Sequence, residues 1–168
     1  MGDHLTLLNV WDQWKEANFS VQWCFENFIQ HRSMIRARDV RDQLAGLMER
    51  VEIELSSSPD DTYAINIRKA ITAGYFYNTA RISKGGSYKT VKHNQSVAIH
   101  PHSALFEVNP RWVLYHELVY TTKEYLRNVI EIENTWLIEV APHYYKEKDI
   151  EDESVKKVPK TVGKAAEY

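Results

Sequence analysis

The sequence lacks long apolar runs and has too few cysteines for an internal disulfide. No stretch of the 168 residues approaches the 18 consecutive apolar residues that a membrane-spanning helix needs, so such a helix is not predicted. The single cysteine, Cys24, cannot pair within the chain, which fits a reducing compartment. Its place in the aromatic run VQWCFENF favours a small core residue over a catalytic thiol.

Strong charge of one sign is also missing. Lys and Arg number 21 and Asp and Glu number 23, so the net charge of −2 gives no overall attraction to nucleic acid. The middle of the chain, residues 76–133, is mildly basic, with 7 basic and 5 acidic side chains. By charge alone, therefore, the chain is not predicted to bind polyanions strongly.

Motifs that carry catalysis are absent from the sequence as well. It contains no Walker-type phosphate loop, no dinucleotide fingerprint and no H-E-x-x-H. GGSYKT at 85–90 has the wrong spacing for a phosphate loop and fits a hairpin turn better. His93, His100 and His102 have no Cys or carboxylate close in sequence, so a metal site is not favoured. We therefore predict no catalytic residue and no bound metal.

Residues 1–75 have helical periodicity and predict a small helical bundle. Asp3 is a candidate N-cap for a helix from Leu5, Ser20 for a second and Ser33 for a third. The third has apolar positions at helical spacing: Val40, Leu44, Leu47, Met48, Val51 and Leu55. SSSPDD at 56–61 breaks the pattern before a fourth helix through YAINIRKAITAGYF. The tryptophans lie in apolar runs and are expected in the core.

After Gly74 the pattern changes to short runs rich in β-branched and aromatic residues. Five runs are separated by turn residues: NTARIS, SYKTVK, SVAIH, RWVLYHELVY and KEYLRNVIEI. A longer segment, 101–110, separates the third from the fourth and has room for one helical turn. Three strands, an insert and two more strands are typical of the OB-fold, a five-stranded Greek-key barrel, so we predict one over 76–142. The last run also satisfies helical spacing, but its β-branched residues favour a strand.

The predicted fold class is thus α+β: a helical bundle, an OB-fold barrel and a charged tail. Residues 143–168 have few large apolar side chains and predict a solvated tail. OB-folds commonly bind single-stranded nucleic acid or oligosaccharide with the loops between strands 1–2 and 4–5. Those loops offer ammonium groups, hydroxyls and aromatic rings: Lys84, Tyr88 and Lys89, and Thr121, Thr122, Lys123 and Tyr125. Ordinary loop polarity is the alternative explanation.

Four arginines surround the start of the third helix, in RSMIRARDVR at 32–41. Cations there oppose the helix dipole, which suggests an anionic partner. Asp39 and Asp42 can also simply neutralise them, and that alternative stays open.

Several segments together resemble the C-terminal region of DEAH-box RNA helicases. They are GDHLTLLNVWDQW, VQWCFENFIQHRSM, VRDQL, IRKAITAGYFYNTARI, YKTVKHNQSVAIHP, RWVLYHELVYTTKEYLRNV and WLIEVAPHYY, in order over residues 2 to 146. HRSMIRARDVRDQL, GYFYNTARI and KKVPKTVGK most resemble the spliceosomal member that acts just before the first splicing step. The resemblance implies that the chain is a fragment with a ratchet-like helical segment at 1–75.

The resemblance also implies what lies upstream and what the fragment does. ATP and Mg would bind two RecA-like motor domains, which precede a winged helix in the family, so the fragment itself would not hydrolyse ATP and would hold no cofactor. The ratchet and OB domains would line the path of single-stranded RNA in a nuclear, non-membrane helicase of pre-mRNA splicing. By the family's pattern, RNA contact falls on Thr121, Thr122 and Lys123, and more weakly on Ser33 and Arg41; Lys84 and Lys89 follow from loop geometry.

A second hypothesis concerns proteins rather than RNA. The same domains could act as a docking platform for a G-patch activator or another spliceosome subunit, with RNA contact incidental. Both hypotheses make the chain an accessory module, whereas a stand-alone hydrolase is nearly excluded because catalytic motifs are missing.

Overall fold

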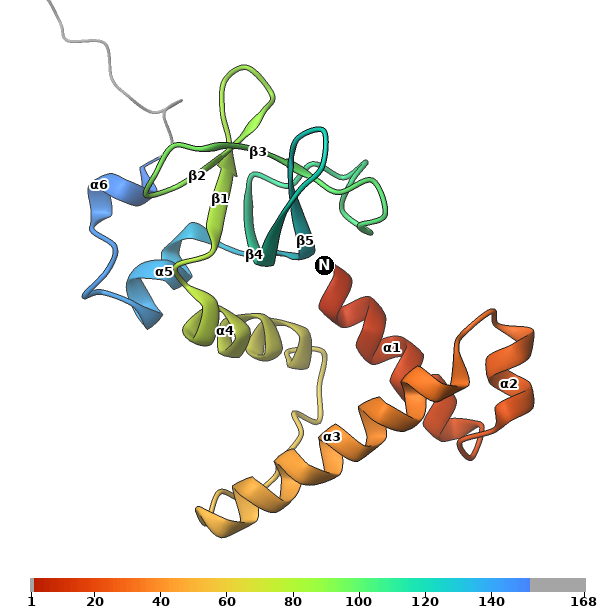
Figure 1. Cartoon of the computed structure of the whole chain (residues 1–168). Helices are drawn as coiled ribbons and strands as arrows, with labels where there is room; N and C mark the ends of the chain where they lie inside the picture. Colours follow the sequence, from red (N-terminus) through yellow and green to blue (C-terminus); the bar gives the residue numbers. More distant parts are fainter. Residues whose placement is uncertain (1, 152–168) are drawn as a thin grey trace, which may run out of the picture.

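The computed structural model describes residues 2–151, which form a three-helix part and a β-barrel flanked by further helices (Figure 1). The helices are α1 (Asp3–Glu16), α2 (Val21–Glu26), α3 (His31–Arg50), α4 (Tyr63–Tyr75), α5 (Asn134–Val140) and α6 (Glu147–Ile150). The strands are β1 (Thr79–Ile82), β2 (Tyr88–Thr90), β3 (Ser96–Ile99), β4 (Trp112–Tyr120) and β5 (Glu124–Glu131). No helix within residues 2–151 is long and apolar enough to cross a bilayer.

The five strands close into a barrel in the order β1-β2-β3-β5-β4, with β1 paired to β4. The β3–β5 pair is parallel and the other four pairs are antiparallel. The OB-fold prediction is confirmed, and the helical alternative for 123–132 is wrong because that segment pairs with both β3 and β4. The insert at 101–110 forms successive turns, and the helical turn expected there is not among the described helices.

The first half of strand β4, residues 112–115, is buried on both faces and separates two hydrophobic clusters. Val113 and Tyr115 point into the barrel, where they pack with Leu126 and Val129 of β5 and with residues of β1–β3. Trp112 and Leu114, on the outer face, pack against α5 in a second cluster: Ile130, Ile132, Trp136, Leu137, Ala141 and Tyr145, with Ile71 and Phe76 beside them. The barrel wall is therefore covered from outside by α4 and α5.

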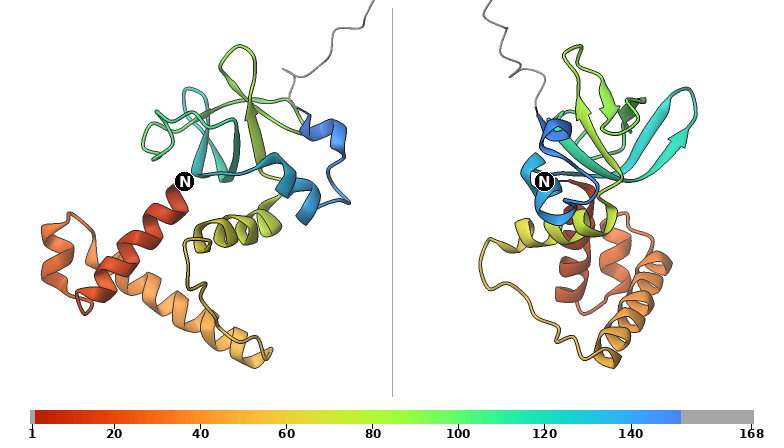
Figure 2. Two further views of the ribbon diagram at one scale, coloured as in Figure 1. Left: turned by 180° about the vertical axis from the view of Figure 1, so that it is seen from behind. Right: turned by 90° about the vertical axis from the view of Figure 1, so that its left-hand side faces the viewer.

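The three N-terminal helices share a small core of their own. Trp14 and Cys24 are 0% and 1% exposed and pack with Met34 of α3. The Trp14 indole N–H donates to the Ser20 carbonyl over 3.2 Å. Helix α4 lies under the barrel instead, and Figures 1 and 2 show α3 apart from it. The prediction of one bundle over 1–75 is therefore wrong for α4, whose apolar side chains pack on the barrel.

Two of the three predicted helix caps are also wrong. The Ser20 hydroxyl accepts from the Trp23 N–H, as predicted. Helix α3 already begins at His31 with Gln30 as its N-cap, so Ser33 lies within the first turn and donates to the Gln30 side chain over 2.7 Å. Helix α1 begins at Asp3 with Gly2 as its N-cap.

Asp3 clamps α1 to the barrel rather than capping the helix. One carboxylate oxygen accepts from the Ser103 hydroxyl (2.8 Å) and the Val129 N–H (2.7 Å), and the other from the Ala104 N–H (2.8 Å). Gly2 forms an isolated bridge with Ile130 of β5. A Cβ on Gly2 would lie 2.6 Å from a backbone oxygen of β5, so the close approach requires glycine.

The beginning of the expected tail packs against the barrel. Tyr145 is 1% exposed and its hydroxyl donates to the Phe76 carbonyl. The Arg81 guanidinium donates to the carbonyls of Asp149 and Glu151, which fixes the end of α6. A solvated tail from residue 143 is therefore wrong for 143–151, because an aromatic anchor and an arginine hold it; the remainder, 152–168, lies outside the described residues.

Candidate functional site

A groove of about 640 Å³ runs across the β2–β3 side of the barrel. It is formed by these two strands together with the β1–β2 loop, the β3–β4 turns and the β4–β5 loop. The lining residues are Gly86, Ser87, Tyr88, Ser96, Val97, Ala98, Ile99, Phe106, Asn109, Tyr120, Lys123 and Glu124. The two loops predicted to bind a ligand therefore meet at one groove.

The β1–β2 hairpin forms one rim of this groove. Its turn is closed by the Gly86 N–H donating to the Ser83 carbonyl and the Ser83 N–H donating to the Ser87 carbonyl. Gly86 has φ +78°, a conformation that glycine adopts without strain. Lys84 is exposed in the same turn. The hairpin turn predicted at 85–90 is thus confirmed.

Two exposed aromatic rings, Phe106 and Tyr120, line the groove and were not predicted as site residues. Phe106 is 44% exposed and Tyr120 is 76% exposed. A sequence signal existed for Tyr120, because it directly precedes Thr121 in the loop that the OB-fold pattern assigns to ligand binding. Flat aromatic faces of this kind can stack with nucleic-acid bases or sugar rings.

The two tyrosines considered at the sequence level are placed differently. Tyr88 is 3% exposed, and its hydroxyl donates to the Pro110 carbonyl inside the barrel wall. Burial raises the pKa of Tyr88 to about 12, with the Glu131 carboxylate adding to the effect. The Tyr125 ring packs edge-on against His100 with centroids 5.3 Å apart. Tyr88 therefore offers no free ring face to a ligand.

Charge at the groove is mixed. Lys123 lines it from the β4–β5 loop, and the Thr121 N–H donates to the Lys123 carbonyl over 3.0 Å, which closes that turn. Lys89 is exposed and pairs across the strands with Ser96, a lining residue, so both side chains lie on the same face of the sheet. Glu124 also lines the groove and accepts a hydrogen bond from Gln95. A bound polyanion would meet one lysine and one carboxylate among the lining residues, with Lys89 beside Ser96 at the edge.

The predicted site residues divide between two places. Thr121, Thr122 and Lys123 are exposed in the β4–β5 loop, and Lys84 and Lys89 are exposed in and after the β1–β2 loop. Ser33 and Arg41 line a different groove, which is formed by α3. Figures 1 and 2 show this helix apart from the barrel. The structure therefore gathers the loop residues around the barrel groove and leaves the two α3 residues out of it.

The single thiol of the chain is poorly placed for nucleophilic chemistry. Burial raises the pKa of the Cys24 thiol, which disfavours the reactive thiolate. Within the described range, no group of three or more His, Cys, Asp or Glu side chains could hold a metal ion. The arrangement is suited to binding an extended ligand.

The sequence was also compared with models of protein families. A match covers residues 67–144, from the middle of α4 through the whole barrel to the segment after α5. The matched family is described as the oligonucleotide/oligosaccharide-binding (OB)-fold. Both the closed β1-β2-β3-β5-β4 barrel and the family match thus identify residues 67–144 as an OB-fold domain.

Proposed function

We propose that the barrel groove binds single-stranded RNA and that the chain is the C-terminal accessory module of a DEAH-box RNA helicase. The observation that carries the proposal is the pairing of two exposed rings, Phe106 and Tyr120, with Lys123 in one groove of an OB-fold. Stacking on aromatic rings is worth about 1–3 kcal/mol per base and tolerates any sequence. Lysine ammonium groups contact the phosphates.

The groove also sets the expected strength of binding. Glu124 opposes Lys123, and the chain carries a net charge of −2, so electrostatics contributes little to affinity. Binding by the isolated chain should be weak and dominated by stacking. A module of this kind would serve as one wall of an RNA path whose remaining contacts come from other domains.

The wider role follows from the resemblance of residues 2–146 to the helicase family. ATP and Mg would act in RecA-like motor domains, which together with a winged helix would belong to the same parent protein. ATP-driven remodelling of the spliceosome during pre-mRNA splicing, in the nucleus, would be the process served. The chain's own contribution would be contact with the RNA, and docking of a G-patch activator on this barrel is the competing hypothesis.

Fluorescence anisotropy with a labelled single-stranded RNA tests the proposal. Tyr120→Ala and Phe106→Ala should each weaken binding by roughly five- to a hundredfold, as expected for loss of one stacked base. Lys123→Ala should weaken binding and reduce the salt slope by about one phosphate contact. Tyr77→Ala is the matched control, because Tyr77 is 51% exposed but lies outside the groove lining.

Two results would overturn the proposal. One is that the groove variants bind RNA as Tyr77→Ala does. The other is that a neutral oligosaccharide binds more tightly than RNA and competes with it, which would assign the aromatic rings to sugar recognition. If RNA affinity is unchanged but a G-patch segment loses affinity for the Lys123 variant, the docking hypothesis replaces the RNA hypothesis.

A further inference from the structure

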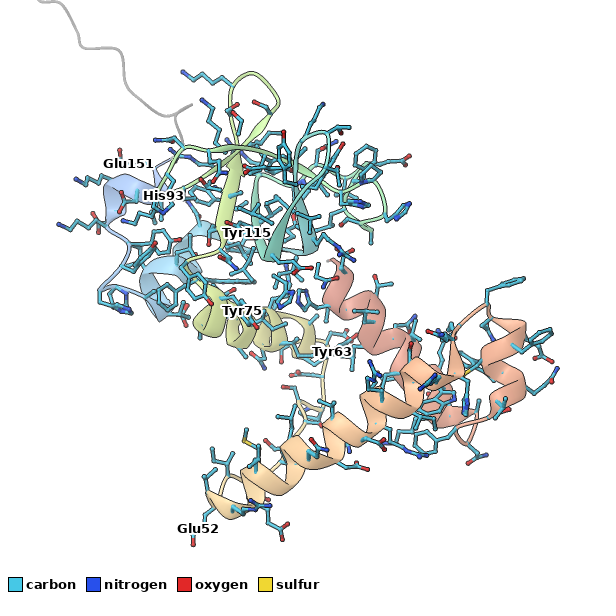
Figure 3. All side chains as sticks on the ribbon, viewed as in Figure 1. Glu52, Tyr63, Tyr75, His93, Tyr115 and Glu151 are labelled. Atoms are coloured by element: carbon cyan, nitrogen blue, oxygen red, sulfur yellow. The ribbon has the colours of Figure 1, made fainter. Side chains whose placement is uncertain are left out.

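Helix α3 presents an apolar stripe that its own chain leaves exposed. Val40, Leu44, Leu47 and Val51 follow one another at alternating spacings of four and three residues, and they are 47%, 52%, 48% and 63% exposed. Only the N-terminal part of α3, around Met34, packs against α1 and α2. Figure 3 places Glu52, just beyond the helix, at its far end from the barrel. An exposed stripe of this size on a folded domain marks an interaction surface.

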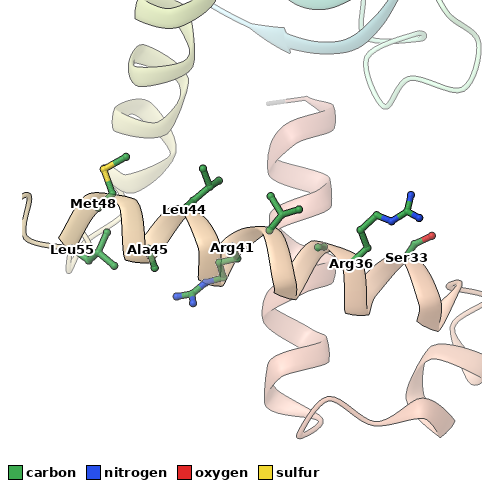
Figure 4. Close-up of a pocket in the computed structure, with 9 residues that line it drawn as sticks. Ser33, Arg36, Arg41, Leu44, Ala45, Met48 and Leu55 are labelled. Carbon is green, nitrogen blue, oxygen red and sulfur yellow. The ribbon is translucent and has the colours of Figure 1, made fainter. Parts of the chain in front are cut away.

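Two residues of the stripe, Val40 and Leu44, also line a groove of about 640 Å³ (Figure 4), and Leu47 and Val51 continue the stripe beyond it. The apolar residues of α3 that line the groove are Ala37, Val40, Leu44, Ala45 and Met48. Leu55 forms a further part of the lining because the chain folds back after α3. The Ile53 N–H donates to the Met48 carbonyl, and Glu52 has φ +58°, which together reverse the chain at the end of the helix. The surface is thus built by a helix and a fixed turn.

The spacing of the stripe identifies the shape of the occupant. Alternating steps of three and four residues form the seam along which one helix packs against another in a coiled coil. A helix of 20 residues is about 30 Å long, so it can hold a partner helix of several turns. Helix-in-groove recognition reads apolar side chains at this spacing. A flexible single strand of RNA has no apolar stripe that would cover these leucines and valines.

The charges beside the stripe identify the chemistry of the occupant. Both charged side chains that line the groove are arginines, Arg36 and Arg41. Arg41 lies 3.6 Å from Asp42, an exposed and therefore weak ion pair, and 5.8 Å from the Trp11 ring centroid. By helical spacing, Asp39 lies on the opposite side of α3 from Arg41. A partner helix that carries acidic residues next to its own apolar stripe would therefore match these two arginines.

A second copy of the chain fits less well. Two antiparallel α3 helices crossing at Leu44 would place Arg36 opposite Glu52 but Arg41 opposite Leu47 and Arg50 opposite Arg38, so only one of the two groove arginines would meet a carboxylate. Parallel helices would place each arginine opposite itself. The chain's remaining segment, 152–168, is rich in lysine and contains a proline, so it lacks the acidic amphipathic pattern.

We propose that the exposed face of α3 docks an acidic amphipathic helix of another protein, with leucine-like side chains on the Val40–Val51 stripe and carboxylates on Arg36 and Arg41. This docking surface is separate from the barrel groove and does not depend on RNA binding there. Its apolar part supplies affinity, and its two arginines select the sign of the partner's charge.

Two designed helical peptides of about three heptads test the proposal. Both carry Leu at the a and d positions; one carries Glu at e and g, and the other carries Lys. The full chain should bind the Glu peptide at least about tenfold more tightly than the Lys peptide. The double substitution Arg36→Glu with Arg41→Glu should reverse that preference, and Leu44→Asp should abolish binding of both peptides.

The control exchanges two arginines of the same helix that do not line the groove. Arg32→Glu with Arg50→Glu makes the same change in net charge and should keep the preference for the Glu peptide. Far-UV circular dichroism checks that every variant retains its helices. Equal binding of both peptides, or binding of neither, would overturn the proposal. So would self-association of the unaltered chain that Leu44→Asp removes, since a second copy would then occupy the stripe, or loss of RNA affinity alone in the Arg36/Arg41 variant.

Discussion

The Asp3 carboxylate should hold α1 on the barrel, so replacing it should loosen the junction between the two parts. Asp3→Ala removes the acceptor for three donors at 2.7–2.8 Å, two of which are backbone N–H groups. A hydrogen bond to a charged group contributes about 1.5–3 kcal/mol. Val129 is 0% exposed, so water cannot replace the carboxylate there, whereas Ala104 is exposed and its N–H can rehydrate. We therefore expect Asp3→Ala to lower the free energy of unfolding by about 3 kcal/mol.

Amide hydrogen exchange and urea denaturation measure this loss. In Asp3→Ala the Val129 N–H should exchange roughly a hundredfold faster, the equivalent of about 3 kcal/mol. Asp3→Asn keeps one acceptor oxygen. Its exchange rate at Val129 should therefore fall between those of Asp3→Ala and the unaltered chain. Asp12→Ala is the matched control, since Asp12 is exposed on the same helix. If Asp3→Ala and Asp12→Ala have the same stability within about 0.5 kcal/mol and the same exchange at Val129, the clamp has no energetic role.

Three further predictions concern the barrel and its coverings. Gly2→Ala should lower the midpoint of thermal unfolding, because its Cβ would lie 2.6 and 2.7 Å from backbone atoms of β5; an unchanged midpoint would show that β5 shifts freely. Burial raises the pKa values of Tyr88 and Tyr145 to about 12. Their contribution to the free energy of unfolding is therefore complete below pH 10 and should be lost between about pH 10 and 12. An ultraviolet titration in which all tyrosines ionise near pH 10 would contradict this prediction. Asp149→Asn should weaken the 2.9 Å ion pair with Lys92 and speed amide exchange in α6, and exchange equal to that of the unaltered chain would deny α6 this support.

The strands were predictable because local chemistry determines them. Each run of β-branched and aromatic residues lies between turn residues, and β5 follows its β-branched residues despite an equally good helical spacing. The helix caps were less predictable. Asp3 has the chemistry of an N-cap, yet its carboxylate reaches donors 100 to 126 residues away, which no local pattern reveals. The packing of α4 was also not predictable locally, because its apolar side chains pack on a barrel that follows it in the sequence.

The site was predictable only in part, for a related reason. The loop positions of Thr122 and Lys123 follow from the OB topology, and the structure places Lys123 in the groove. Tyr88 has the same aromatic character as Tyr120, but the strand alternation turns Tyr88 inward and leaves Tyr120 exposed. Phe106 lies in turns without periodicity, so the sequence gives no sign that it lines the groove. Whether a given side chain faces the ligand is a tertiary property.

The clamp between α1 and β5 also has a consequence for the order of events during translation. Asp3 and Val129 are separated by 126 residues, so at about 5–20 residues per second a ribosome needs roughly 6–25 s to add the second after the first. Throughout that interval the contacts of α1 with the barrel are missing and the small core around Trp14 and Cys24 joins α1, α2 and α3, while the leucines and valines of α3 are already emerging. A nascent chain should therefore expose a binding surface for chaperones before the barrel can close on Gly2 and Asp3.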